Sequence, residues 1–163
     1  MTLDQPKQNK FDPLDEKLLG MLRADARATN RDMAKALGIS EITVAARIRS
    51  LTDRKLMRVT AQQDIWTLGF DLVVLADIFV AGRPAEQVAA DLAKIDQVGS
   101  VSVTLSSPEL IIQLVARDRA DLARLLQEDI AAVAGITHVE TLIVLDIYRF
   151  RSDMGVLDTD DHA

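Results

Sequence analysis

Residues 29–51 have the sequence TNRDMAKALGISEITVAARIRSL, in which a glycine separates two short helical patterns. Thr29 is a suitable cap for the first helix, and Gly38 suits the left-handed conformation that ends many helices. Ser40 is a suitable cap for the second helix. That helix carries an apolar stripe at helical spacing, formed by Val44, Ile48 and Leu51. Two short helices around a tight glycine turn predict a helix-turn-helix, whose second helix enters the major groove of DNA.

A further helical pattern precedes this pair. Asp12 is a suitable cap, Pro13 suits the first helical position and Asp15 complements the positive end of the helix dipole. The apolar residues of this pattern recur at helical spacing and are Leu14, Leu18, Leu19 and Leu22. The three helices predict a DNA-binding domain over residues 11–63, preceded by a flexible arm, residues 1–10. Residues 56–62 are expected to form a short β segment at the position of a wing.

The second helix of the pair has an outward side opposite its apolar stripe. About 100° of rotation per residue places on that side Ile42, Ala46, Arg49 and Ser50. Glu41 and Thr43 fall in the first turn, where such helices contact base edges. Arg49 suits guanine, Ile42 suits a thymine methyl group and Glu41 suits cytosine. The alternative is that Arg49 binds only phosphate and that Ile42 packs at the wing.

Two other groups complete the predicted DNA-binding set. Arg47 lies toward the edge of the buried side of its helix, which favours a structural or phosphate-binding role. The start of the preceding helix could offer backbone N–H groups and a cation to phosphate, or could act only as a helix start. The predicted DNA-binding residues are Thr29, Asn30, Arg31, Ser40, Glu41, Ile42, Thr43, Ala46, Arg47, Arg49 and Ser50.

From residue 72 the apolar period changes from helical to alternating, as expected of strands. The expected strands cover residues 72–80, 98–105, 110–116 and 137–150, and the expected helices cover residues 84–94 and 118–135. This order predicts a ferredoxin-like βαββαβ domain over residues 72–150, with both helices on one face of an antiparallel sheet. A linker, residues 64–71, and an acidic tail, residues 151–163, flank it. The whole chain is therefore expected to be an α+β protein of two domains.

The charge distribution separates the same two parts. The chain has a net charge of −6, yet residues 10–60 hold 11 basic and 7 acidic side chains, a net charge of +4. Residues 61–163 hold 7 basic and 17 acidic side chains, a net charge of −10. Only the first part is thus expected to approach phosphate, unless the asymmetry is random variation in surface charge. The chain has no cysteine and no apolar run of membrane-spanning length, which favours the cytoplasm and no membrane partner.

The sequence resembles the Lrp/AsnC family of transcription regulators along nearly its whole length. In the first half the resemblance is carried by Leu14-Asp15 with Leu18-Leu19, Asp25-Ala26-Arg27, Leu37-Gly38-Ile39-Ser40 and Val44-Ala45-Ala46-Arg47-Ile48-Arg49-Ser50-Leu51. In the second half it is carried by Leu68-Gly69 and by residues 141–146, which are similar to the family's amino-acid-metabolism regulatory domain. The resemblance implies a regulator of transcription that binds an amino acid or similar metabolite between dimers of the C-terminal domain.

One loop departs from the family pattern. Where the family has Gly-x-x-Asp between the second and third strands, this chain has Ser106-Ser107-Pro108-Glu109. Serine hydroxyl groups could donate to a carboxylate, and Glu109 could accept from an ammonium group, although Pro108 removes one N–H donor. The residues expected to bind the effector are Thr104, Ser106, Ser107, Pro108, Glu109 and Thr141. The alternative is an ordinary hairpin turn in a ligand-independent regulator.

Siroheme decarboxylases have a similar two-domain layout and offer an enzymatic alternative. They carry Tyr and His residues near the second and third strands, where this chain has Ser102-Val103-Thr104-Leu105-Ser106-Ser107. His138 lies near the last strand without a nucleophile or ligand-spaced partner, so no catalysis, cofactor or metal is expected. A sensing module that has lost DNA binding would have a degraded recognition helix, whereas this one is intact. We expect a homodimer or higher even oligomer that binds a pseudo-palindromic site in double-stranded DNA.

Overall fold

The computed structural model describes residues 11–151. Residues 11–61, with Arg151, belong to one compact unit, and residues 62–150 belong to a second. The predicted arm, residues 1–10, and the predicted tail beyond Arg151 lie outside the described residues. The predicted domain bounds stay predictions.

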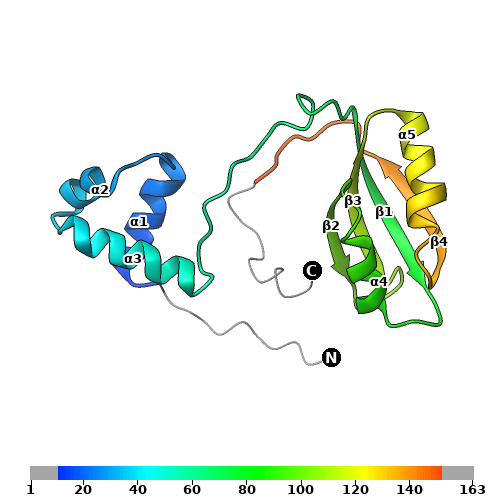
Figure 1. Ribbon diagram of the computed structural model, residues 1–163, viewed down its shortest axis with the longest axis horizontal. Coiled ribbons are helices and arrows are strands. Elements are labelled where there is room, and N and C mark those ends of the chain that lie inside the picture. Colours follow the sequence, from blue (N-terminus) through cyan, green and yellow to red (C-terminus); the bar gives the residue numbers. More distant parts are fainter. Residues whose placement is uncertain (1–10, 152–163) are drawn as a thin grey trace. The chain divides into compact units, whose positions relative to one another are not determined.

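The first unit consists of helices α1 (Pro13–Ala24), α2 (Asn30–Leu37) and α3 (Glu41–Asp53) (Figure 1). The predicted caps are confirmed, because the side chains of Asp12, Thr29 and Ser40 each accept a backbone N–H bond at the start of their helix. Gly38 ends α2 with φ of +68°, a conformation that glycine adopts without steric cost. The side chains buried between the three helices are Leu18, Met33, Ala34 and Val44. The helix-turn-helix predicted from residues 29–51 is thus confirmed.

The expected β segment over residues 56–62 is wrong. The N–H of Leu56 donates to the carbonyl oxygen of Leu51 at 2.9 Å, which continues the turn that ends α3. Residues 57–64 belong to no strand. A β segment needs a partner strand for its backbone groups, and within the described chain no strand is paired with this stretch.

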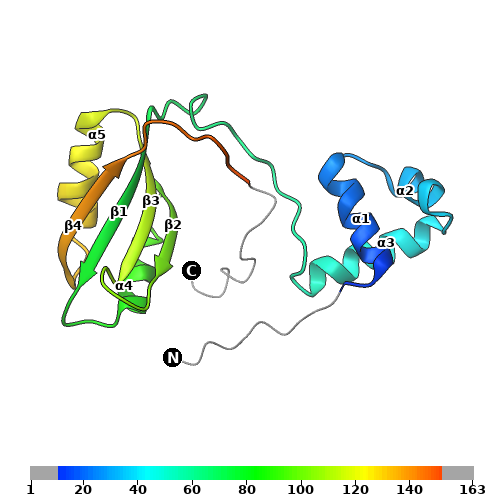
Figure 2. The same cartoon turned by 180° about the vertical axis from the view of Figure 1, so that it is seen from behind.

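The second unit is a four-stranded antiparallel sheet in the order β2-β3-β1-β4, and it confirms the predicted ferredoxin-like topology. Its strands are β1 (Leu72–Val80), β2 (Val98–Val103), β3 (Leu110–Ala116) and β4 (Ile136–Ile143). Its helices are α4 (Ala85–Leu92) and α5 (Arg119–Arg124), the latter continued by the π-helical turn η1 (Leu125–Ile130). Both helices contribute to one apolar core with the sheet, and Figure 2 shows the strands in front of them.

The last strand is shorter than predicted, because β4 ends at Ile143 and not at residue 150. Ile143 lies opposite Val74, and the N–H of Val144 donates to the carbonyl oxygen of Val73 at 2.9 Å. Since β1 begins at Leu72, the chain beyond Val144 runs past the end of β1, the one strand paired with β4 in the described part of the chain. The apolar composition of residues 144–150 therefore does not reflect sheet pairing.

The sheet has a second face that neither helix covers, which we call the open face. It holds the alternate residues of each strand, namely Val73, Leu75, Asp77, Phe79, Ser100, Ser102, Ile111, Gln113, Val115, His138, Glu140 and Leu142. Leu75 lies directly opposite Leu142, and Ile111 lies diagonally across from Leu75. All three apolar side chains are exposed, Leu75 by 38%, Leu142 by 58% and Ile111 by 39%. They form an apolar cluster on a solvent-facing sheet surface.

The helix-covered side carries a charge network whose contribution to stability depends on pH. Asp121 accepts hydrogen bonds from the backbone N–H of Arg117 and from the side chains of Arg124 and Gln97, each at 3.0 Å. The bond from Arg117 and then those from Arg124 and Gln97 lower the pKa of this carboxyl group below its ordinary value. A lowered folded-state pKa stabilises the fold above the unfolded-state pKa, and this stabilisation is lost as the pH falls through the folded-state value.

We expect Asp121→Asn to lower the free energy of unfolding at pH 7, with a gap from the wild type that closes as the pH falls below roughly 4. Urea titrations at pH 7 and at the lowest pH where both proteins fold would measure this gap. The exposed substitution Asp96→Asn is the control. A gap of unchanged size at the lower pH would contradict the assignment.

Candidate DNA-binding surface and effector loop

The structure divides α3 into an inward and an outward side, as the sequence predicted. Val44 and Leu51 are 0% and 1% exposed, whereas Ile42 is 82% exposed. The exposed residues of α3 include all the predicted outward and first-turn residues, Glu41, Ile42, Thr43, Ala46, Arg49 and Ser50. One continuous surface of about three helical turns therefore presents a cation, an anion, hydroxyl groups and an apolar side chain.

The hydroxyl groups at the helix starts already have partners within the protein. The hydroxyl group of Thr29 accepts from the N–H of Asp32 at 3.2 Å and donates to the Asp32 carboxylate at 2.7 Å. The hydroxyl groups of Ser40 and Thr43 are 2.8 Å apart, and the N–H of Thr43 donates to Ser40 at 3.1 Å. These bonds explain the capping role of Thr29 and Ser40. Of the residues predicted at the start of α2, Asn30 and Arg31 are also exposed, and their phosphate-binding role stays a prediction.

Arg47 points to the protein rather than to the outward side of α3. Its Nη1 atom donates to the carboxylates of Asp12 and Asp15, at 3.3 Å for Asp15. The hydrogen bond to Asp12 raises the pKa of Arg47. The pKa of Asp12 is lowered, mainly by the hydrogen bond from the N–H of Asp15 and further by Arg47. Sequence reasoning assigned Asp12 and Asp15 only to the start of α1. It missed this ion pair because the partners are 35 and 32 positions apart and no local pattern connects them.

The predicted effector loop is a hairpin tip closed by its own hydrogen bonds. The N–H of Thr104 donates to the carbonyl oxygen of Glu109 at 2.9 Å. The single hydroxyl proton of Thr104 is shared between the carbonyl oxygens of Ser106, at 2.6 Å, and Pro108. The Ser107–Pro108 peptide bond is cis. Ser106 and Ser107 are exposed and stand at the tip.

Glu109 has a partner that the sequence did not reveal. Its Oε2 atom accepts from the N–H of Val80 at 2.9 Å, next to the irregular pairing of β1 and β4. The carboxylate thus connects the loop to the end of β1. Its second oxygen, Oε1, is the acceptor that an ammonium group would use.

Thr141 does not lie with the other predicted effector residues in one protomer. It is an exposed residue of β4 opposite Ala76, whereas the loop joins β2 and β3. Because β1 lies between β3 and β4, two strand spacings of about 5 Å each separate them. A shared site of Thr141 and the loop would need a second copy of the chain.

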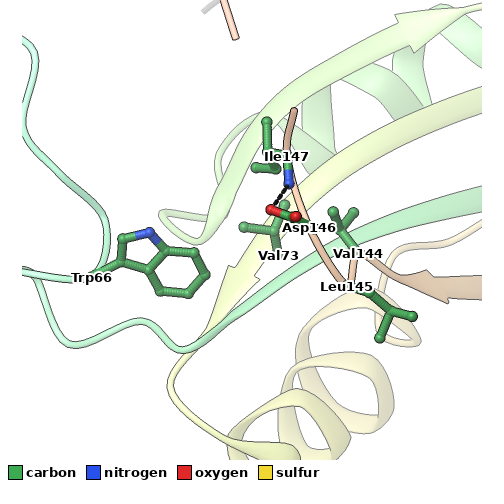
Figure 3. A pocket seen from close by; sticks show the side chains of 6 residues that line it. All are labelled: Trp66, Val73, Val144, Leu145, Asp146 and Ile147. Atoms are coloured by element: carbon green, nitrogen blue, oxygen red, sulfur yellow. Dashed lines mark hydrogen bonds between the residues drawn. The ribbon is translucent and has the colours of Figure 1, made fainter. Parts of the chain in front are cut away.

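A cavity of about 170 Å³ lies beside the end of β4, lined by Trp66, Val73, Val144, Leu145, Asp146 and Ile147 (Figure 3). The Asp146 carboxylate in it accepts from the N–H of Ile147 at 2.8 Å. Pockets for small molecules usually enclose about 300–1,000 Å³, so this hollow is small for a metabolite. None of the predicted effector residues lines it.

Within residues 11–151 no three His, Asp or Glu side chains are grouped so that they could hold a metal ion. The helices of that stretch include none of the length and apolarity that a membrane span requires.

Comparisons with known proteins find the same two parts. A family model described as the AsnC-type helix-turn-helix domain matches residues 11–52, and one described as the Lrp/AsnC ligand binding domain matches residues 73–154. The HTH-type transcriptional regulator FL11 of Pyrococcus horikoshii is 25% identical over 147 residues, which cover 90% of this chain and 97% of that protein.

Solved structures share the fold. AsnC of E. coli matches with a TM-score of 0.81 at 24% identity, over 88% of this chain and 97% of that one. A transcriptional regulator of Neisseria meningitidis, solved as a complex with L-Met, matches with a TM-score of 0.79 at 15% identity, over 90% of this chain and 97% of that one.

A helix-turn-helix with an exposed recognition helix, followed by a ligand-binding α+β domain, defines a transcription regulator of the helix-turn-helix class. The chain belongs to the Lrp/AsnC family, which confirms the resemblance found in the sequence.

Proposed function

We propose that this regulator recognises a pseudo-palindromic DNA site through the outward side of α3 and responds to an amino acid or similar metabolite bound at the Ser106–Glu109 loop. The observation that carries the proposal is the outward side itself, where Ile42 is 82% exposed beside exposed Arg49 and Glu41. These side chains suit a thymine methyl group, guanine and cytosine in the major groove. Asn30 and Arg31 hold the neighbouring phosphates.

The proposed assembly is a homodimer, or a higher even oligomer, in which the open face of the sheet meets the same face of a second copy. This assembly is supported by the apolar cluster of Leu75, Ile111 and Leu142, because its large side chains are exposed to solvent in a single chain. A two-fold axis places the open face of one protomer against the open face of the other and so pairs two DNA-binding domains. Two such domains spaced about one helical turn apart bind a pseudo-palindrome.

The proposed effector is a small molecule with an ammonium group and a carboxylate. Glu109 Oε1 accepts from the ammonium group, and the exposed hydroxyl groups of Ser106 and Ser107 donate to the carboxylate. Thr104 and Pro108 shape the hairpin tip, and Thr141 comes from another copy. The L-Met complex of the Neisseria regulator supports an amino-acid ligand. A ligand-independent hairpin is the second candidate, favoured by the bonds that already close the loop.

An effector bound in this way should raise the Tm of the wild type, because it binds only the folded state, and should shift the affinity for DNA. Thermal melting and calorimetry against the twenty amino acids at millimolar concentration would measure both effects. Glu109→Gln keeps the acceptor for Val80 but removes the charge, so we expect at least a tenfold loss of effector affinity, on the order of 1.4 kcal/mol. Glu128→Gln, an exposed substitution of the same kind on the helix-covered side, is the control. A response unchanged in Glu109→Gln and Ser106→Ala would favour the ligand-independent candidate.

The experiment that tests the whole proposal is to map genomic DNA fragments bound by the purified protein, with and without the amino-acid panel. We expect a small set of fragments that share a two-fold related sequence, with occupancy changed by the effector. Uniform binding to all fragments would contradict sequence-specific regulation. The proposed place of action is the cytoplasm, where bacterial and archaeal DNA is accessible.

We further propose that the protein regulates without catalysis. The siroheme-decarboxylase alternative requires Tyr and His residues near β2 and β3, where the chain has Ser102 to Ser107 instead. His138, on β4, contacts the Glu140 carboxylate at 3.5 Å and the ring of Phe79. The exposed His138 on the open face thus contacts a carboxylate and an aromatic ring, neither of which is a hydroxyl or thiol nucleophile.

A further inference from the structure

Asp15 is the one charged residue that is buried among residues 11–151, with 5% of its surface exposed. A buried carboxylate is costly unless hydrogen bonds and an opposite charge satisfy it. Asp15 accepts from the N–H of Asp12 at 3.4 Å, within the capping box of α1, and from Arg47 of α3 at 3.3 Å. The same Arg47 nitrogen bonds the Asp12 carboxylate. The start of α1 and the middle of α3 are therefore joined by one charge network.

We propose that Arg47 is a positioning residue for DNA recognition, whose ion pair with Asp12 and Asp15 sets the orientation of α3 instead of contacting phosphate. This inference rests on the proposed DNA contacts of α3.

The remaining attachment of α3 is less directional. Its inward side packs through Val44, Ile48 and Leu51, and apolar contact alone tolerates small rotations because it has no preferred direction. Arg47 lies within one turn of Ala46, Arg49 and Ser50, so its ion pair holds the part of α3 that is proposed to face DNA. A side chain extends 5–6 Å from the helix axis, so a rotation of roughly 20° moves its tip by about 2 Å. That shift exceeds the tolerance of a hydrogen bond to a base edge.

Two other roles for Arg47 make different predictions. If Arg47 contacted phosphate, its loss would weaken binding to every DNA sequence and reduce the salt dependence by about one unit of slope. If the ion pair only stabilised the fold, its loss would lower Tm without changing the preference of the folded protein for its operator. A positioning role instead lowers the ratio of operator affinity to nonspecific affinity at unchanged salt slope.

The test uses the full chain, a mapped operator duplex and an unrelated duplex, with binding measured by fluorescence anisotropy from about 50 to 200 mM salt. The variants are Arg47→Met, which keeps the aliphatic stem, and Arg47→Lys, which keeps the charge. Lys35→Met removes one exposed positive charge from α2 and is the matched control. We expect Arg47→Met to lower the ratio of operator affinity to nonspecific affinity at least tenfold. Its affinity should depend on salt with the same slope as that of Lys35→Met. Arg47→Lys should recover part of that ratio.

Asp12→Asn supplies a second measurement that does not depend on the arginine. Asparagine caps a helix as well as aspartate does, so α1 should remain folded while the charge pair is weakened. The substitution also removes a negative charge from the DNA-binding unit, which by electrostatics alone should strengthen binding to any DNA. We expect operator affinity to fall all the same, while nonspecific affinity rises or stays constant. Circular dichroism at the assay temperature confirms that each variant is folded.

Three outcomes would overturn the inference. The first is that Arg47→Met loses affinity equally for both duplexes and has a reduced salt slope. The second is that Arg47→Met and Asp12→Asn both keep the wild-type ratio of operator affinity to nonspecific affinity. The third is that Asp12→Asn binds the operator more tightly than the wild type does. If the wild type itself does not distinguish the operator from the unrelated duplex, the proposed function fails. If the wild type distinguishes the two duplexes and the variants keep its affinity ratio, the positioning role fails and the proposed function stands.

Discussion

Replacing Ile42 and Arg49 together with alanine should lower the affinity for a mapped operator by about 2–6 kcal/mol, roughly 30-fold to 10⁴-fold. Each contact to a base edge is worth about 1–3 kcal/mol, and the two side chains lie on the outward side of α3. Neither belongs to the apolar core of the three helices, so the fold should remain intact. Alanine is also the residue with the best helix propensity.

Titrations of both proteins on the same operator at matched salt would measure this loss. Affinity for unrelated DNA should fall much less, since only one charge is removed. Lys35→Ala removes one charge from the same unit and should change both affinities slightly. Equal affinity of the wild type and the double variant for the operator would refute the assignment of this surface.

The second large effect concerns assembly. Leu142→Asp should convert the dimer to a monomer at micromolar concentration, because it introduces a carboxylate into the centre of the proposed interface. Leu142 is 58% exposed in the single chain and lies opposite Leu75, so the substitution costs the isolated sheet little. Operator affinity should fall by roughly 10²–10⁴, since two linked DNA-binding domains lose their avidity.

Sedimentation velocity with and without operator DNA would give the oligomeric state and the affinity. Gln127→Asp adds the same charge to the helix-covered side and should leave the dimer intact. A wild type that sediments as a monomer while it binds the operator fully would exclude an assembly through the open face.

Local patterns predicted most of the first unit. Caps such as Thr29 and Ser40, the glycine that ends α2 and the spacing of Val44, Ile48 and Leu51 each act within one helix, so the sequence alone reveals them. The outward side of α3 followed from the same spacing. The order of strands and helices in the second unit was also predictable, because the apolar period changes at residue 72.

Features that depend on distant partners were not predictable in this way. The end of β4 is set by where β1 begins, and the apolar residues that follow Val144 gave no sign of it. The expected wing had a strand-like composition, but no strand among residues 11–151 pairs with it. The bonds of Arg47 to Asp12 and of Glu109 to Val80 join residues 35 and 29 positions apart, and no local pattern relates them.

The two sides of α3 also bear on how such regulators diverge after gene duplication. The stripe of Val44, Ile48 and Leu51 maintains the fold, while Ile42, Ala46, Arg49 and Ser50 contribute little to it. If the outward side of α3 reads the operator as proposed, a duplicated copy can acquire a different operator through a few substitutions on one surface while it keeps its folding stability. New regulatory targets then arise without an unstable intermediate.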